Sequence, residues 1–287
     1  MKPRKPSTSN FEALNSPNLY HLLLSTSKMA SFIPRTAPRA FHALRAARPR
    51  PVQLQRPAAP LFRRFLATPA GEQPRLRLGS TAPNFKAKTT HGDIDFHQFL
   101  GDKWGILFSH PADFTPVCTT ELGAFAKLKD EFESRGVKMI GLSANGLDSH
   151  AKWIEDINDI SQTSLQFPII ADADRKIAFL YDMLDAQDLE NIDEKGIAFT
   201  IRSVFIIDPT KKIRLTMMYP ASCGRNTSEV LRVIDSLQTA DKKGITTPID
   251  WQVGDDVIVP PTVSTADARK KFREVREVRP YLRFTTI

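Results

Sequence analysis

Short apolar segments alternate with stretches of helical periodicity from about residue 75 to residue 239. The segment 104–109 is a continuous apolar run with the length of a buried strand, whereas Leu122, Phe125, Leu128 and Phe132 recur at spacings of three and four. On the same grounds we expect helices at 117–134, 147–160, 175–181 and 227–237, and strands at 104–109, 137–143, 167–170, 203–207 and 213–218. This alternation predicts an α/β domain over residues 75–239, with helices packed on a central sheet.

Residues 240–287 have a different pattern. They are rich in proline and carry the aromatic residues Trp251, Tyr281 and Phe284, which follow no core periodicity. We therefore expect a small appended C-terminal region whose exposed aromatic side chains are covered by a partner subunit, in a homodimer.

The first 70 residues cannot build a hydrophobic core. They hold 10 of the 21 prolines, neither glycine nor aspartate, and 12 lysines and arginines against one acid, Glu12. Arginine-rich, acid-poor N-termini are typical of mitochondrial transit peptides, and we expect residues 1–70 to be one, disordered in itself. Met29 opens a stretch with the form of a complete presequence, so Met1 and Met29 are alternative starts of translation. The simpler alternative is a basic tail without a targeting role.

The composition and charge exclude several classes of protein. At 41% hydrophobic and 25% charged residues, with two cysteines, the chain is neither fibrous nor a disulfide scaffold. No segment approaches the roughly 18 unbroken apolar residues of a membrane span, so we expect a soluble protein without membrane attachment. The net charge of +8 arises from residues 1–70, which carry +11, while the remainder carries −3. A nucleic-acid-binding surface on the body of the protein is therefore not expected.

The segment 110–123, HPADFTPVCTTELG, carries the most informative chemistry. Cys118 falls in the first turn of a predicted helix, where unpaired N–H groups and the helix dipole stabilise an anion and so favour the nucleophilic thiolate. Thr115 precedes it by three residues, at a distance that allows its hydroxyl to lie beside the sulfur. Pro111 and Pro116 stiffen the loop. The alternative is that Cys118 is a small buried hydrophobic residue, against which the polar Thr119, Thr120 and Glu121 argue.

The pattern Pro111, Thr115, Cys118 resembles the active-site signature of the peroxiredoxins. With His110 before it and Thr119-Thr120-Glu121 after it, the segment is similar to the one-cysteine peroxiredoxins, particularly the mitochondrial fungal type. The similarity runs from about Leu78 to the C-terminus and includes the YPASCGRN and PYLRF segments. It implies a thioredoxin-like fold and reduction of hydrogen peroxide and organic hydroperoxides.

The resemblance also implies roles for individual residues. Cys118 attacks the peroxide and becomes a sulfenic acid, while Thr115 and the Cys118 backbone bind the peroxide oxygens. Arg202 holds the thiolate and the substrate, and its permanently charged guanidinium suits that role. The remaining pocket residues are Glu121, which orients the arginine, together with His110 and Pro111.

Cys223 is not expected to resolve the sulfenic acid. Two-cysteine relatives carry the resolving thiol in the C-terminal tail, and this chain has no cysteine after residue 223. The sulfenic acid then needs an external thiol, either glutathione with glutaredoxin or thioredoxin. No cofactor and no metal are expected, because the two cysteines and the scattered histidines show no ligand spacing. Two other hypotheses stay open at this point: a peroxide sensor or redox-regulated chaperone, and a plain binding module on the same scaffold.

Overall fold

The computed structural model describes residues 76–185 and 199–287, and the predicted transit peptide at 1–70 lies outside them. A seven-stranded sheet has the order β2-β1-β5-β4-β3-β6-β7. Its strands are β1 (Lys86–Thr89), β2 (Gly92–Asp95), β3 (Trp104–Ser109), β4 (Val137–Ser143), β5 (Ile169–Ala171), β6 (Arg202–Ile207) and β7 (Ile213–Tyr219). The central strands β3, β4 and β5 are parallel, and β6, which forms a hairpin with β7, pairs antiparallel with β3. The predicted α/β architecture is confirmed.

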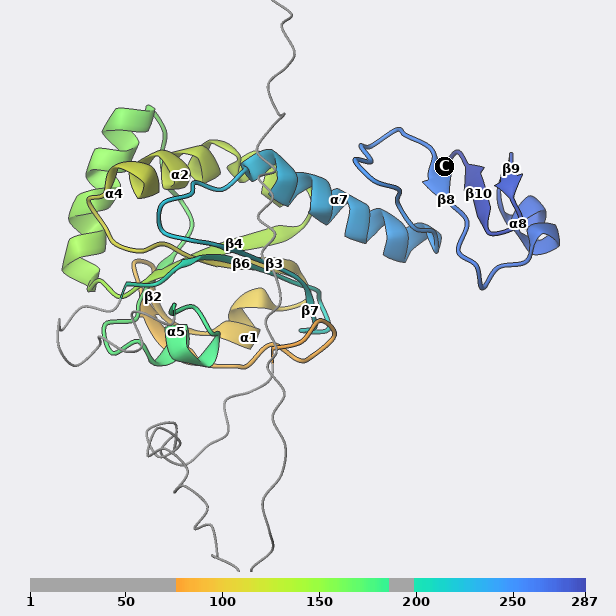
Figure 1. The fold of residues 1–287 in the computed structure, drawn as a ribbon. Helices are drawn as coiled ribbons and strands as arrows, with labels where there is room; N and C mark the ends of the chain where they lie inside the picture. The colour runs from red at the N-terminus through yellow and green to blue at the C-terminus, as the bar shows by residue number, and fades with distance from the viewer. Residues whose placement is uncertain (1–75, 186–198) are drawn as a thin grey trace, which may run out of the picture. The chain divides into compact units, whose positions relative to one another are not determined.

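Helices cover both faces of this sheet (Figure 1). Helices α2 (Pro116–Lys127), α4 (Leu147–Ser161) and α7 (Thr227–Lys243) lie on one face, and the short helices α1 (Phe96–Leu100) and α5 (Lys176–Leu180) lie on the other. Among residues 76–185 and 199–287, no helix combines the length and apolar character needed to cross a membrane.

Each central strand contributes side chains to both faces because neighbouring residues of a strand point in opposite directions. In β3, Ile106 and Phe108 belong to the cluster under α2, α4 and α7, whereas Leu107 belongs to the cluster under α1 and α5. β6 divides in the same way, with Val204 on the first face and Phe205 on the second. The resulting two-layered core explains why these strands read as unbroken apolar runs.

Two predicted helix boundaries are wrong. The segment 117–134 is two helices, α2 and α3 (Lys129–Ser134), which are separated at Leu128. Helix α7 begins at Thr227, as predicted, with Asn226 as its N-cap, but it continues to Lys243, after which Gly244 is the C-cap with a φ of 63°. The predicted domain boundary at residue 240 therefore lies inside a helix. The extension was missed because the last turns of α7 carry mainly polar residues.

The C-terminal region has its own sheet and its own core. Strands β8 (Val257–Ile258), β10 (Leu282–Thr285) and β9 (Arg276–Arg279) form an antiparallel sheet beside helix α8 (Thr265–Lys271). Trp251, expected to be exposed, is 2% exposed and packs in a cluster with Val257 and Phe272. Its indole N–H donates to the carbonyl of Asp255 at 3.2 Å, which satisfies the polar edge of the ring. The prediction fails because this small core buries the ring within the same chain.

The other two aromatic residues of this region are more accessible than Trp251. Tyr281 is 73% exposed, as expected. Phe284 is half-buried, and the guanidinium of Arg276 lies 4.8 Å from the centre of its ring.

Gly123 of α2 lies directly against Ser161, the last residue of α4. A Cβ atom there would lie 2.0 Å from Oγ and 2.7 Å from Cβ of Ser161. We predict that Gly123→Ala lowers the free energy of unfolding, because overpacking costs about 1–3 kcal/mol against a helix-propensity gain of about 1 kcal/mol. Denaturant unfolding of Gly123→Ala, Ser161→Gly and the double variant should give a coupling free energy of at least about 1 kcal/mol. Additive single effects would show that the contact does not limit packing.

Candidate active site

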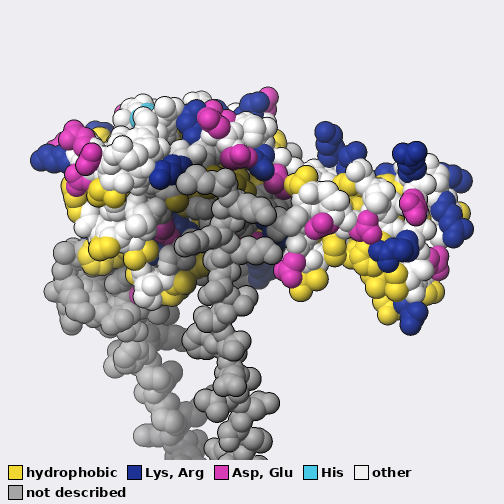
Figure 2. All heavy atoms as spheres, turned by 90° about the horizontal axis from the view of Figure 1, so that it is seen from above, with side chains coloured by type: hydrophobic (Ala, Val, Ile, Leu, Met, Phe, Trp, Pro, Cys, Tyr) yellow, Lys and Arg dark blue, Asp and Glu magenta, His cyan; other side chains and the backbone are white. Residues whose placement is uncertain are grey.

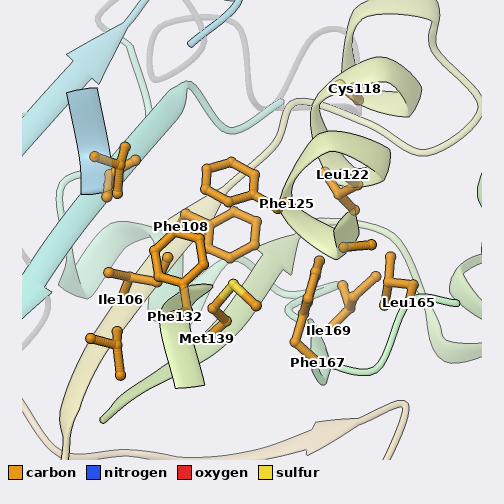
Figure 3. Close-up of a cluster of buried hydrophobic side chains, with 14 of the residues drawn as sticks. Ile106, Phe108, Cys118, Leu122, Phe125, Phe132, Met139, Leu165, Phe167 and Ile169 are labelled. Carbon is orange, nitrogen blue, oxygen red and sulfur yellow. The ribbon is translucent and has the colours of Figure 1, made fainter. Parts of the chain in front are cut away.

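Cys118 is the third residue of α2, at the end of the loop that follows the central strand β3. Thr115 is the N-cap with an extended backbone, and Pro116 opens the helix with its fixed φ. No side chain forms a capping hydrogen bond at this helix start. The positive end of the helix dipole and the unpaired first-turn N–H groups therefore remain available to stabilise a negative charge on the sulfur. Figure 3 shows Cys118 one turn before Leu122 in the buried cluster of the α2 face, and its side chain is fully buried.

The loop before α2 is held by its own hydrogen bonds. The hydroxyl of Thr115, expected beside the sulfur, donates to the carbonyl of Ala112 at 3.0 Å. The carbonyl of Thr115 accepts from both the N–H and the hydroxyl of Thr119, at 3.0 and 2.8 Å. Phe114, the residue before Thr115, has a φ of 55°, an uncommon conformation for an aromatic residue, and it is 54% exposed. Pro111 is buried.

Arg202, the first residue of β6, reaches the sulfur. Its Nη1 lies 3.2 Å from Sγ of Cys118 and 2.7 Å from Oε2 of Glu121. Its Nε and Nη2 donate to the carbonyl of Ala221 at 3.0 and 2.8 Å. The guanidinium is buried and held from three sides, so it cannot turn away from the thiol. The structure therefore brings Cys118, Arg202 and Glu121 together.

Arg225 is a site residue that sequence reasoning missed. Its Nη2 donates to Oε2 of Glu121 at 2.9 Å, and its backbone N–H donates to Oε1 at 2.6 Å. Its Nη1 donates to the carbonyls of Ser109 and Ser203 at 2.8 and 3.1 Å. In the sequence, Arg225 is marked only by its place two residues after Cys223.

The charges of this buried group do not balance without the sulfur. Burial raises the pKa of Glu121, but the ion pairs with Arg225 and Arg202 outweigh it and keep that pKa below its ordinary value. One carboxylate thus faces two guanidinium groups, and an uncompensated positive charge remains beside Cys118. A thiolate at Cys118 would neutralise it.

His110 is buried in a second group of polar side chains. Its Nε2 lies 2.8 Å from Oδ1 of Asp113, and the Oδ2 of Asp113 lies 2.7 Å from Nδ1 of His150. Burial lowers the pKa of His110, which favours the neutral ring. Ligand atoms of the three residues lie within 4.8 Å of one another. Since both nitrogens that face the carboxylate stand at hydrogen-bonding distance from it, we assign the group as a hydrogen-bonded network and not as a metal centre. Sequence reasoning included His110 but missed Asp113 and His150.

The two cysteines differ in accessibility. Both are free thiols, but Cys118 is buried and Cys223 is exposed on the segment that follows β7. The carbonyl of Ala221 in this segment anchors Arg202, so the segment contributes backbone to the site.

Two family models match the chain. The AhpC/TSA family matches residues 78–216, and the C-terminal domain of 1-Cys peroxiredoxin matches residues 236–274. The second match begins at residue 236, inside α7, and so before the predicted division at residue 240.

Curated relatives and solved structures agree with these models. The mitochondrial peroxiredoxin PRX1 of Saccharomyces cerevisiae is 61% identical over 215 residues, which cover 75% of this chain and 82% of the relative. Peroxiredoxin-6 of Homo sapiens is 50% identical over 220 residues, 73% of this chain and 97% of the relative.

Two solved structures share the fold. A yeast mitochondrial 1-Cys peroxiredoxin superimposes with a TM-score of 0.68 at 56% identity and covers 74% of this chain and 100% of its own. A peroxiredoxin 6 of Arenicola marina gives a TM-score of 0.70 at 44% identity, over 74% and 98% of the two chains. The thioredoxin-like fold and the mitochondrial fungal type expected from the resemblance are confirmed. The chain belongs to the peroxiredoxin family, as a mitochondrial one-cysteine thiol peroxidase.

Proposed function

We propose that Cys118 is the peroxidatic residue of this enzyme and Arg202 its fixed cation. The observation that carries the proposal is the 3.2 Å approach of Nη1 of Arg202 to Sγ, in a buried group that holds one positive charge in excess. The thiolate attacks one peroxide oxygen, an S–O bond forms as the O–O bond breaks, and the leaving alkoxide or hydroxide takes up the proton that the thiol released. Cys118 becomes a sulfenic acid and the peroxide an alcohol or water.

The other pocket residues act on the substrate or on the two reacting groups. We assign the peroxide oxygens to Thr115, to the backbone N–H of Cys118 and to Arg202, since all three surround the start of α2. Glu121 fixes the direction of Arg202. His110 and Pro111 form the buried wall of the loop and exclude water.

Turnover uses an external thiol. One thiol condenses with the sulfenic acid to give a mixed disulfide and water, and a second thiol releases Cys118 as a new disulfide leaves. Cys118 is buried and Cys223 is exposed, and both are free thiols, so they form no internal pair in this structure. The yeast structure concerns thiol resolving via glutathione/thioredoxin systems, so we propose one of these reductants for this chain too.

The C-terminal region supports a homodimer. Figure 2 shows hydrophobic side chains exposed on this region next to lysines and arginines. Ile249, Val253 and Tyr281 are each more than 70% exposed, and apolar side chains gathered in one region are typical of an interaction surface. We propose that a second copy of the chain covers them, and that residues 1–70 direct the protein to the mitochondrion.

Cys118→Ser is predicted to abolish peroxide consumption, whereas Cys223→Ser retains it, because only Cys118 faces the excess charge. Stopped-flow reaction with one equivalent of peroxide, followed by intact mass, should show one added oxygen in Cys223→Ser and none in Cys118→Ser. A disulfide between the two cysteines in the unmodified protein would contradict the one-cysteine cycle.

Glu121→Gln is predicted to destabilise the protein by about 3 kcal/mol and to slow the peroxide reaction, because it leaves two buried guanidinium groups without a counter-charge. The lowered pKa of Glu121 means that its stabilising effect is present above its ordinary pKa of 4.5 and is lost as the pH falls below it. Urea unfolding between pH 3 and pH 7 should therefore show a steeper acid loss in the unmodified protein than in Glu121→Gln. If stability fell equally steeply with pH in both proteins, the two arginines would not lower the pKa of Glu121.

Tyr281→Asp is predicted to weaken the dimer, since a carboxylate would have to be buried at the interface. Sedimentation at micromolar concentration should give a dimer for the unmodified protein and a shift toward monomer for the variant. An exposed control, Lys88→Asp, should leave the dimer unchanged. A monomeric unmodified protein would rule the proposal out.

A further inference from the structure

A network of buried polar side chains lies beside the peroxidatic loop, and of its members only His110 has a role in the chemistry assigned above. At its centre is Asp113, whose carboxylate accepts from Nε2 of His110 at 2.8 Å, from the Ser149 hydroxyl at 2.7 Å and from Nδ1 of His150 at 2.7 Å. The side chains of Asp113 and both histidines are fully buried. Burial raises the pKa of Asp113, but the hydrogen bonds from the two histidines outweigh it and the net shift is strongly downward, so the carboxylate is ionised.

His150 stands between two groups that can only accept hydrogen bonds. Its Nδ1 faces the ionised carboxylate of Asp113, and its Nε2 lies 3.2 Å from the backbone carbonyl of Ile170 in β5. A neutral imidazole has one N–H donor and one lone pair, so it could satisfy only one of these two contacts and would turn a lone pair toward the other oxygen. Only the imidazolium form donates to both.

His110 has the opposite environment. Its Nε2 faces Asp113, but its Nδ1 is buried and has no hydrogen-bond partner within the described part of the chain. One N–H therefore suffices, on Nε2. Arg225 also disfavours a charge on His110. The two histidines on either side of one carboxylate thus differ in protonation.

We infer that His150 is a positioning residue, held as a buried imidazolium between Asp113 and the carbonyl of Ile170, that fixes the loop leading to Cys118. The inference rests on the proposed role of Cys118. The groups that face the pair are His110 and Asp113 from the loop, Ser149 from α4, Ser143 and Asn145 from the end of β4, and the Ile170 carbonyl from β5. With one negative and one positive charge, the pair is neutral overall, which makes its complete burial tolerable.

The network connects to the catalytic helix at two points of α4. His150 and Ser149 hold Asp113, which lies five residues before Cys118. One turn along α4, the indole N–H of Trp153 donates to the Thr119 hydroxyl at 3.1 Å, in the first turn of α2. The N–H of Asp113 is also fixed, by Oδ1 of Asn145 at 3.0 Å. A shift of His150 would therefore move both the loop and the helix start, and displacements of about 1 Å at a reacting group can cost a hundredfold in rate.

The protonation states can be measured directly on the resting protein, without peroxide. Nitrogen-15 NMR of the imidazole rings in the mature enzyme at pH 7 is expected to show both ring nitrogens of His150 protonated and only one protonated in His110. In Asp113→Asn the new amide can donate to Nδ1 of His150 while its oxygen accepts from His110, so His150 should become singly protonated. A singly protonated His150 in the unmodified protein would overturn the inference, as would stoichiometric zinc released on denaturation.

The positioning role is tested by rate. His150→Gln is expected to lower the second-order rate constant for hydrogen peroxide by about tenfold, whereas the matched control His91→Gln, on the exposed turn between β1 and β2, should react as the unmodified protein does. Should His150→Gln not fold, Ser149→Ala removes a bond to the same carboxylate oxygen, and we expect about a threefold loss. A folded variant of either kind with the full rate would overturn the positioning role. Because Cys118→Ser tests the peroxidatic role separately, failure of one proposal does not imply failure of the other.

Discussion

The buried carboxylate of Glu121 is the contact on which the rest of the site depends. It comes from the second turn of α2, and it binds one guanidinium from the start of β6 and another from the segment before α7. Burying three charged groups is costly unless each is paired and hydrogen-bonded, and the carbonyls of Ala221, Ser109 and Ser203 complete the set. The arrangement leaves one positive charge unpaired, and the sulfur of Cys118 lies within reach of it.

This charge imbalance links stability and catalysis. Arg225 does not touch the sulfur, yet it lies against the rings of Phe108 and Phe125 and holds both oxygens of Glu121. Its place in the apolar cluster fixes the carboxylate, and the carboxylate fixes Arg202. The orientation of the Arg202 guanidinium thus depends, through Glu121, on the packing of Arg225. The site is therefore already in place before peroxide binds and needs no reorganisation.

The helix α4 has a matching role on the other side of Cys118. It packs closely on α2 at Gly123, bonds to the first turn of α2 through Trp153 and holds the preceding loop through Ser149 and His150. The loop that carries Phe114 at a positive φ is thereby kept in a strained form. Arg202 and Glu121 on one side, and the hydrogen bonds from α4 on the other, therefore hold the first turn of α2 in place.

Local patterns in the chain were sufficient to predict the five strands β3 to β7, the order of the helices α2, α4, α5 and α7 and the place of Cys118 in a first turn, because period and capping act over a few residues. The short strands β1 and β2 and the three strands of the C-terminal region were not predicted. The resemblance carried by Pro111, Thr115 and Cys118 added Arg202 and Glu121. The sequence alone did not identify Arg225, Asp113 or His150 as parts of the site. Arg225 binds Glu121 across 104 positions and His150 binds Asp113 across 37, whereas Asp113 is only 3 positions from His110. Their roles follow from their burial, which the sequence does not show. It also misplaced Trp251, whose small core forms within the C-terminal region. Periodicity determines which face of an element is apolar, but the pairing of buried charges is decided by tertiary structure, because the cost of an unpaired charge appears only once water has been excluded.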